Sequence, residues 1–163
     1  MSRLLEGVKI LDFTQYKAGP MGTQILGDMG ADVIKIERSR GGDLERSFAT
    51  FGRLTGEGDS PFFLALNRNK RSLALNIKTP EAREVIYKLA AEADVVVQNF
   101  RPGVLEKLGY GYEDFKKINP EIIYCSNSGY GLTGPYVRRP GQDLLAQSMS
   151  GMVMMNGTEE FPV

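Results

Sequence analysis

The stretch Val8–Arg40 constrains the fold more than any other part of the chain, because it reads as a strand, a helix and a second strand with short connections. The apolar run Val8–Phe13 predicts a buried strand, and Asp32–Glu37 predicts the second one. Between them, apolar residues recur at helical spacing and predict one buried helix face: Met21, Ile25, Leu26 and Met29. Gly30 follows at the position of a left-handed helix cap. Such a βαβ unit predicts a right-handed crossover and a parallel sheet.

A parallel sheet also predicts where chemistry can sit, because ligands bind beyond the carboxyl ends of its strands. Those ends are Phe13–Ala18 and Glu37–Arg40, which are therefore the first candidates for a binding site. Glu37 lies where a dinucleotide-binding fold places its ribose-binding acid. However, the fingerprint G-x-G-x-x-G is absent, since the turn has only the glycines of Gly19–Gly22 and is crowded by Lys17. A nicotinamide or flavin site is not expected.

The rest of the chain continues to alternate strands and helices. Strands are predicted at Leu73–Lys78, Asp94–Gln98 and Ile122–Cys125. Helices are predicted at Ser60–Leu66, Thr79–Ala93, Val104–Leu108, Tyr112–Ile118 and Gln142–Met155, and loops at Gly41–Gly58 and Ser126–Arg139. In the last helix, the methionines are predicted to pack rather than to bind a ligand: Met149, Met152, Met154 and Met155. Five strands alternating with helices predict an α/β, Rossmann-like, doubly wound sheet, mostly parallel and of order 3-2-1-4-5.

Composition excludes several kinds of site. The 163 residues are 42% apolar and 25% charged, which is typical of a soluble globular domain. There is no histidine, so imidazole acid–base chemistry and His-ligated zinc are excluded, and the lone Cys125 excludes an internal disulfide and a multi-cysteine metal site. No apolar run approaches the roughly 20 residues of a membrane-spanning helix, and Met1–Gly7 does not resemble a signal peptide. The expectation is a cytoplasmic protein with neither a metal nor a membrane span.

Charge is balanced overall but not along the chain. The segment Lys35–Lys78 contains nine Lys or Arg and five Asp or Glu, and is therefore net +4 in a chain whose total is zero. A local basic excess in a neutral protein favours one compact polyanion over a nucleic-acid backbone, whose partners are usually basic overall. The alternative is a solvated loop with scattered charges.

Eight motifs occur in a fixed order: Ile10–Thr14, Ala18–Pro20, Gly30–Arg38, Gly41–Asp43, Asn69–Lys78, Val95–Gly103, Leu108–Pro120 and Ser128–Tyr136. With this ordered set the sequence closely resembles the amino-terminal part of class III CoA-transferases. That group contains formyl-CoA transferase, carnitine CoA-transferase, the bile-acid-inducible CoA-transferases and α-methylacyl-CoA racemase. The resemblance covers nearly all 163 residues. No single motif is decisive, but the ordered set is specific.

The resemblance implies a Rossmann-like domain that binds coenzyme A as acyl-CoA. Residues 1–163 would form its amino-terminal segment, with the rest of that domain and a small domain in later chain, and two full-length subunits would interlock as a homodimer. In the implied reaction, an aspartate attacks the acyl-CoA thioester to form a mixed anhydride and release CoA thiolate. The thiolate then attacks the anhydride to give an aspartyl-CoA thioester, and a free carboxylic acid finally takes the CoA. Backbone N–H groups can stabilise each oxyanion in such steps.

The resemblance assigns contacts with CoA to nine positions: Ala18, Arg38, Leu75, Lys78, Asn99, Phe100, Arg101, Lys107 and Leu108. Arg38 matches a contact with the CoA nucleotide, while Leu75 and Lys78 match positions that line the adenine and phosphate pocket. Lys107 stands where formyl-CoA transferase has arginine, so the charge is kept but the bidentate fork is lost. The alternatives are a structural surface charge at each basic position and a plain turn former at Asn99.

Three departures from the family pattern limit what can be carried over. Lys17 replaces a glutamine of formyl-CoA transferase, so oxalate chemistry is not assumed. Gln142 replaces the base histidine of the racemases, and glutamine cannot abstract an α-proton, which disfavours racemisation. The family's nucleophilic aspartate is expected beyond Val163, and Asp143 is not nominated in its place.

Three functional readings follow. The leading one is the CoA-binding portion of a CoA-transferase, which alone is expected to bind a CoA ester weakly or not at all and not to turn over. The second is an acyl-CoA racemase, and the third is a non-catalytic CoA-binding or assembly module.

Overall fold

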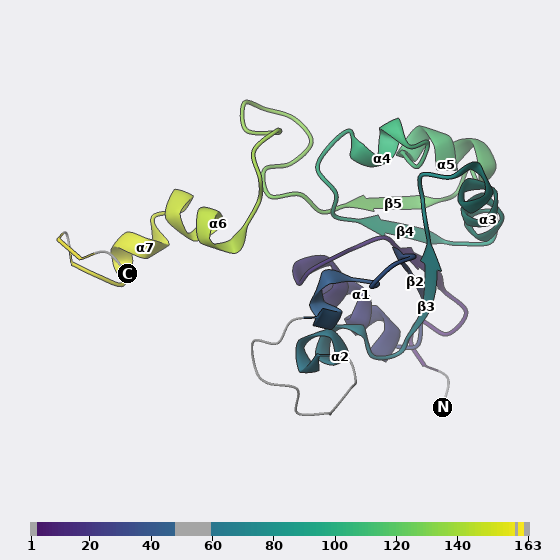
Figure 1. Cartoon of the computed structure of the whole chain (residues 1–163), viewed down its shortest axis with the longest axis horizontal. Coiled ribbons are helices and arrows are strands. Elements are labelled where there is room, and N and C mark those ends of the chain that lie inside the picture. The colour runs from purple at the N-terminus through teal and green to yellow at the C-terminus, as the bar shows by residue number, and fades with distance from the viewer. Residues whose placement is uncertain (1–2, 48–59, 159, 162–163) are drawn as a thin grey trace. The chain divides into compact units, whose positions relative to one another are not determined.

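The computed structural model describes residues 3–47, 60–158 and 160–161. Five strands form an all-parallel sheet of order β3-β2-β1-β4-β5, which confirms the predicted α/β class and strand order (Figure 1). The strands are β1 (Lys9–Asp12), β2 (Asp32–Arg38), β3 (Lys70–Leu75), β4 (Val95–Gln98) and β5 (Ile123–Ser126).

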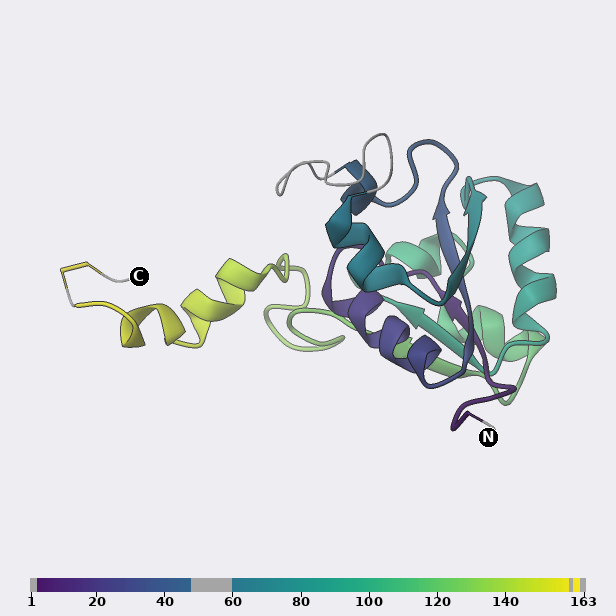
Figure 2. The ribbon, with the colours of Figure 1, turned by 90° about the horizontal axis from the view of Figure 1, so that it is seen from below.

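Helices cover both faces of this sheet. The helices are α1 (Ala18–Asp28), α2 (Pro61–Asn67), α3 (Pro80–Ala90), α4 (Val104–Lys107) and α5 (Tyr112–Ile118), and a 3-10 turn, η1 (Leu44–Ser47), precedes α2. Helices α1 and α2 lie on one face, and α3, α4 and α5 lie on the other (Figures 1 and 2). None of the described helices is long and apolar enough to span a bilayer.

Contacts divide the chain into two compact units, Met1–Asn127 and Ser128–Val163. The first holds the sheet, and the second holds α6 (Asp143–Met149) and α7 (Met152–Met155). A single helix over Gln142–Met155 was therefore a wrong prediction, because Gly151 adopts φ +80° and interrupts it. The four methionines are at least half exposed in the described chain, so the predicted packing role is not observed: Met149, Met152, Met154 and Met155.

Local sequence signals set most of the observed boundaries. The Thr79 hydroxyl accepts a backbone N–H from the first turn of α3 at 3.3 Å, and Pro80 opens that helix, which matches the predicted start at Thr79 within one residue. Gly30 follows α1 at φ +109°, a conformation that glycine adopts without strain. In contrast, the third strand begins and ends earlier than the predicted Leu73–Lys78, since Asn76–Lys78 form a turn.

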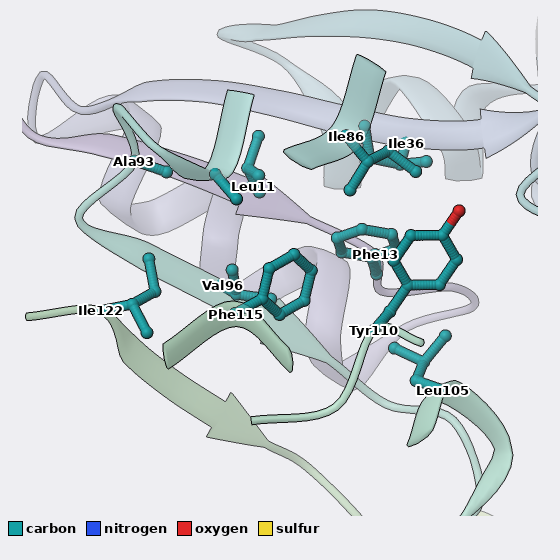
Figure 3. Packing of buried hydrophobic residues seen from close by; sticks show 11 residues of the cluster. Leu11, Phe13, Ile36, Ile86, Ala93, Val96, Leu105, Tyr110, Phe115 and Ile122 are labelled. Carbon is teal, nitrogen blue, oxygen red and sulfur yellow. The ribbon is translucent and has the colours of Figure 1, made fainter. Parts of the chain in front are cut away.

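One face of the sheet carries an apolar core (Figure 3). The aromatic rings of Phe13, Tyr110 and Phe115 lie with their centroids 5.9–6.3 Å apart at its centre. The buried members come from β1, β2 and β4, from the helices that cover this face and from the adjoining loops: Leu11, Phe13, Ile36, Ile86, Ala90, Ala93, Val96, Leu105, Tyr110, Phe115 and Ile122. This core fixes the strand positions from which the functional loops leave the sheet.

Helix α1 packs on the opposite face of the sheet. The residues that it buries are not those that its apolar periodicity predicted. Met21 and Ile25 are 48% and 46% exposed, whereas Leu26 is partly buried against the cluster that contains Ile10 and Val33, so only part of the predicted apolar face meets the sheet. The buried positions of α1 are small or polar instead: Gly19, Pro20, Thr23, Gln24 and Gly27. The reason is steric, since a Cβ atom at Gly19 would lie 2.4 Å from the Cβ atom of Thr14. Small residues let the helix approach the strand ends closely.

The predicted exposed loop Gly41–Gly58 is described only as far as Ser47. Its described part contains η1 and buries the acidic side chains of Asp43 and Glu45, contrary to the expectation of an exposed loop. Residues 48–58 lie outside the described residues.

Candidate functional site

A small hollow lies at the carboxyl edge of the sheet, where the sequence predicted a site. We call it the strand-end pocket; residues from or following β1, β2, β3 and β4 line it: Phe13, Gln15, Ile36, Glu37, Arg38, Leu75, Ile77 and Phe100. Three of these were predicted site residues, namely Arg38, Leu75 and Phe100. They are far apart in sequence, so the parallel sheet is what brings them together.

The three predicted residues lie at or just beyond the carboxyl ends of their strands. Arg38 and Leu75 are the last residues of β2 and β3 and are paired in the register of the sheet. Phe100 follows β4 and packs partly against the apolar core. The exposed Arg38 donates from Nε to the carbonyl of Gly42 at 2.9 Å, which orients its guanidinium at the pocket rim.

The other predicted residues lie outside the pocket lining. Ala18 is the exposed first residue of α1, and Lys78 lies exposed in the turn after β3. Arg101 is exposed before α4, Lys107 is the exposed last residue of α4, and Leu108 caps that helix and packs partly on the core. All of these belong to the first unit, and the structure brings none of them into the hollow itself.

Asn99 spans two of the strand-end loops. Its Oδ1 accepts the amide N–H of Gln15 at 2.8 Å, and its Nδ2 donates to the carbonyl of the same residue at 2.6 Å. The neighbouring Gln98 is buried and fixes the same loop, because its Oε1 accepts the amide N–H of Phe100 at 2.7 Å and its Nε2 donates to Ser126 at 2.7 Å. The loop after β4 is thus tied to both adjacent strand ends.

The buried carboxylate of Glu37 is one of the groups that line the pocket. Burial would raise the pKa of Glu37, but hydrogen bonds from Arg46, Ser72 and the Asp43 backbone outweigh that effect and lower the pKa to about 2. The ion pair with Arg46 spans 2.6 Å. Because Glu37 also binds the backbone of Asp43, it holds the turn whose Gly42 carbonyl orients Arg38.

Two buried ion pairs join strand side chains to one another and to the turn before η1. Lys70 contacts Asp12 at 3.0 Å and also donates to the Pro20 carbonyl at 2.9 Å, while Lys35 contacts Asp43 at 2.7 Å. All four paired side chains are at most 2% exposed. Burial lowers the pKa of Lys70, and the Asp12 carboxylate opposes that effect. Pairing is what makes charges tolerable at such depth.

Another buried acid, Glu45, lies next to the pair of Lys35 and Asp43. Glu45 is fully buried, and its carboxyl group lies within hydrogen-bonding reach of the Asp43 carboxylate. Burial and, to a smaller extent, the adjacent Asp43 carboxyl together raise the pKa of Glu45 to about 8. The side chain is therefore protonated near neutral pH.

Ion pairs account for much of the basic excess that the sequence shows in Lys35–Lys78. Five of the nine basic residues in Lys35–Lys78 form ion pairs: Lys35, Arg46, Arg68, Lys70 and Arg71. Among the described residues, Arg38, Arg40 and Lys78 form none, and all three are exposed. The cations available to an anionic ligand are therefore fewer than the sequence suggested, and two of them flank the carboxyl edge of β2.

Sequence reasoning placed Gln15 and Glu37 at strand ends where a site was expected, but it nominated none of Gln15, Ile77 and Glu37 as a contact with CoA. Alternation of Leu73, Leu75 and Ile77 did place Ile77 on the same side as Leu75, although it follows the strand. No local pattern indicated that Glu37 would be buried, because its partner Arg46 lies beyond the glycine-rich turn.

The chain belongs to CoA-transferase family III, whose family model matches residues 5–163. The resemblance found in the ordered motifs is thereby confirmed.

Named relatives carry related activities. The chain is 50% identical over 156 residues to the succinyl-CoA:glutarate CoA-transferase of Mus musculus, covering 96% of this chain and 35% of the relative. It is 42% identical over 162 residues to the formyl-CoA:oxalate CoA-transferase of Escherichia coli O6:H1, covering 99% and 38%. A solved CAIB/BAIF family protein from Brucella suis matches with a TM-score of 0.89 at 42% identity, covering 100% and 43%. The chain therefore spans well under half the length of these relatives.

Proposed function

We propose that this chain supplies the CoA-binding portion of an enzyme that transfers CoA between an acyl-CoA and a free carboxylic acid, through an aspartyl-CoA thioester. One observation carries the proposal: the strand-end pocket unites Arg38, Leu75 and Phe100, three positions that the family resemblance assigned to CoA. Membership of CoA-transferase family III supports it.

The chemistry of the pocket suits a nucleotide. Leu75, Ile77 and Phe100 offer apolar surface against which a flat purine ring can pack, and the Arg38 guanidinium at the rim can pair with phosphate oxygens. Lys78, which forms no ion pair within the described ranges, adds a second cation in the turn after β3. The remaining proposed contacts surround this edge of the sheet: Ala18, Asn99, Arg101, Lys107 and Leu108.

The substrates we propose are a CoA ester and a carboxylic acid acceptor. Relatives are named for succinyl-CoA with glutarate and for formyl-CoA with oxalate, so small dicarboxylic acids are the first acceptors to test. We also propose that the enzyme acts in the cytoplasm as an interlocked homodimer. The expectation that these 163 residues alone do not exchange acyl groups stays a prediction, and a chromatographic assay with succinyl-CoA and glutarate tests it.

Calorimetric titration of the chain with CoA tests the binding proposal. Weak binding is expected for the wild type, and Arg38→Ala is expected to weaken it about tenfold, because a charge-assisted contact with phosphate is lost. Arg71→Ala is the matched control: the same side chain is removed from the amino end of β3, where it pairs with Asp32 at 2.5 Å on the surface. An equal loss of affinity in both variants, or no loss in either, would contradict the proposal.

A further inference from the structure

We infer that Asn99 is a positioning residue of the strand-end pocket: its side-chain amide holds the Gln15–Ala18 turn in the conformation that forms one pocket wall. The inference rests on the proposed CoA site, whose walls include both Gln15 and Phe100. Asn99 immediately precedes one wall residue and is bonded to the other.

The two hydrogen bonds fix the orientation of the Asn99 amide. Its Oδ1 must face the Gln15 N–H, which can only donate, and its Nδ2 must face the Gln15 carbonyl, which can only accept. The first bond has a normal length at 2.8 Å, and the second is short at 2.6 Å. The Asn99 side chain therefore bonds both the N–H and the carbonyl of Gln15, which lies 84 positions away in the sequence.

The turn that is held is one that a free chain would rarely adopt. Tyr16, the residue after Gln15, has φ +71°, in the left-handed region that bulky side chains disfavour. Such a conformation persists only where surrounding contacts determine it. The turn leads directly to Ala18 at the start of α1, which is a proposed CoA contact. Loss of the Asn99 bonds frees this turn to relax away from the pocket.

The chain contains a natural control at the opposite edge of the sheet. Asn119 also makes two bonds with the backbone: its Nδ2 donates to the Ala93 carbonyl at 2.8 Å, and its Oδ1 accepts the Glu121 N–H at 3.1 Å. These bonds lie at the amino ends of β4 and β5, away from the pocket. Asn119→Ala removes a comparable pair of bonds without touching the candidate site.

Nuclear magnetic resonance on the ¹⁵N-labelled chain tests the inference without ligand. In Asn99→Ala, amide hydrogen exchange at Gln15 is expected to become faster, and the Tyr16 and Lys17 resonances are expected to shift, while exchange within β1 is unchanged. A role in direct ligand contact alone would leave these free-state signals as they are. Unchanged exchange and shifts would therefore overturn the inference.

Titration with CoA completes the test. Asn99→Ala is expected to weaken binding about fivefold or more, as two hydrogen bonds are lost, whereas Asn119→Ala is expected to bind like the wild type. Wild-type binding that Asn99→Ala leaves unchanged contradicts the inference, while a wild type that binds no CoA contradicts the proposed function instead.

If Asn99→Ala does not fold, the same measurements are made on Asn99→Asp. A carboxylate there still accepts the Gln15 N–H but cannot donate to the Gln15 carbonyl. In Asn99→Asp, the Gln15 amide is expected to stay protected from hydrogen exchange, while CoA is expected to bind more weakly than to the wild type. Wild-type affinity would contradict the inference.

Discussion

The two faces of the sheet are built by different means. The face under α3 and α5 buries eleven apolar or aromatic residues in one continuous cluster. The face under α1 and α2 has a smaller apolar cluster of four described residues and also buries Phe63 and Leu66 of α2, and much of the remaining buried surface consists of paired charges and hydroxyl groups. The apolar face depends on shape and volume, whereas the α1 face depends on each buried charge meeting its partner.

The difference matters for function because the polar face lies under the first strand-end turn. Asp12 accepts hydrogen bonds from Lys70, from the Thr23 hydroxyl and from both the amide and the hydroxyl of Thr14. It thereby fixes the point at which the chain leaves β1 for the turn at Gln15. Buried polar networks of this kind specify one arrangement of the backbone, which an apolar contact does not.

The largest expected effect is loss of a buried partner on the polar face. Lys70→Met should cost about 3–5 kcal/mol of unfolding free energy, because Asp12 is left as an uncompensated buried charge. Ile86→Val, at a fully buried site on the apolar face, should cost only about 1 kcal/mol. Urea denaturation of both variants measures the two losses. Equal losses of unfolding free energy in the two variants would contradict the claimed difference between the two faces.

A second expected effect is a pH dependence that comes from the polar face. Because the pKa of Glu45 is raised from 4.5 to about 8 in the folded chain, its contribution to stability is fully present below 4.5 and is lost as pH rises through 8. Glu37, whose pKa is lowered to about 2, changes stability only in acid. Denaturation midpoints from about pH 5 to about pH 9 should therefore fall in the wild type and fall less in Glu45→Gln. Parallel slopes in the two proteins would show that Glu45 is not the titrating group.

The smallest expected effect is on the outer side of α1. Met21→Gln should change stability by less than about 0.5 kcal/mol, because the side chain is half exposed. Thermal unfolding measures it, with Thr23→Ala as the buried comparison on the same helix. Thr23→Ala should be the more damaging of the two, since it removes a donor to Asp12. A larger loss of stability in Met21→Gln than in Thr23→Ala would instead indicate that Met21 lies on a buried apolar face of α1, as the periodicity predicts.

The elements of the fold were predictable because local signals and hydrophobic patterns agree with the structure. The run Val8–Phe13, the capping residues Thr79–Pro80 and the glycine at Gly30 each predicted an element or its end, and the alternation of elements predicted the strand order. Apolar periodicity failed at α1, because close approach to the sheet requires Gly19 rather than a large side chain. It failed again at α6 and α7, because Gly151 breaks the pattern.

The candidate site was predictable only in part. The strand ends followed from the βαβ pattern, and the residues at Arg38, Leu75 and Phe100 followed from the family resemblance. The bonds between Asn99 and Gln15 could not be predicted, since they join loops that only the folded sheet brings together. The same holds for Lys70 and Asp12, whose pairing buries charges that the sequence presents as solvated.

Mapping CoA onto the labelled chain tests the central claim most directly. A ¹⁵N chemical-shift titration with CoA should perturb amides around the strand-end pocket, at Gln15, Arg38, Leu75 and Phe100, and leave the amino ends of the strands unchanged. Such a pattern would place the ligand where the four strands end. Perturbations confined to the amino edge, or no perturbation at saturating CoA, would contradict the claim that this edge of the sheet is the CoA site.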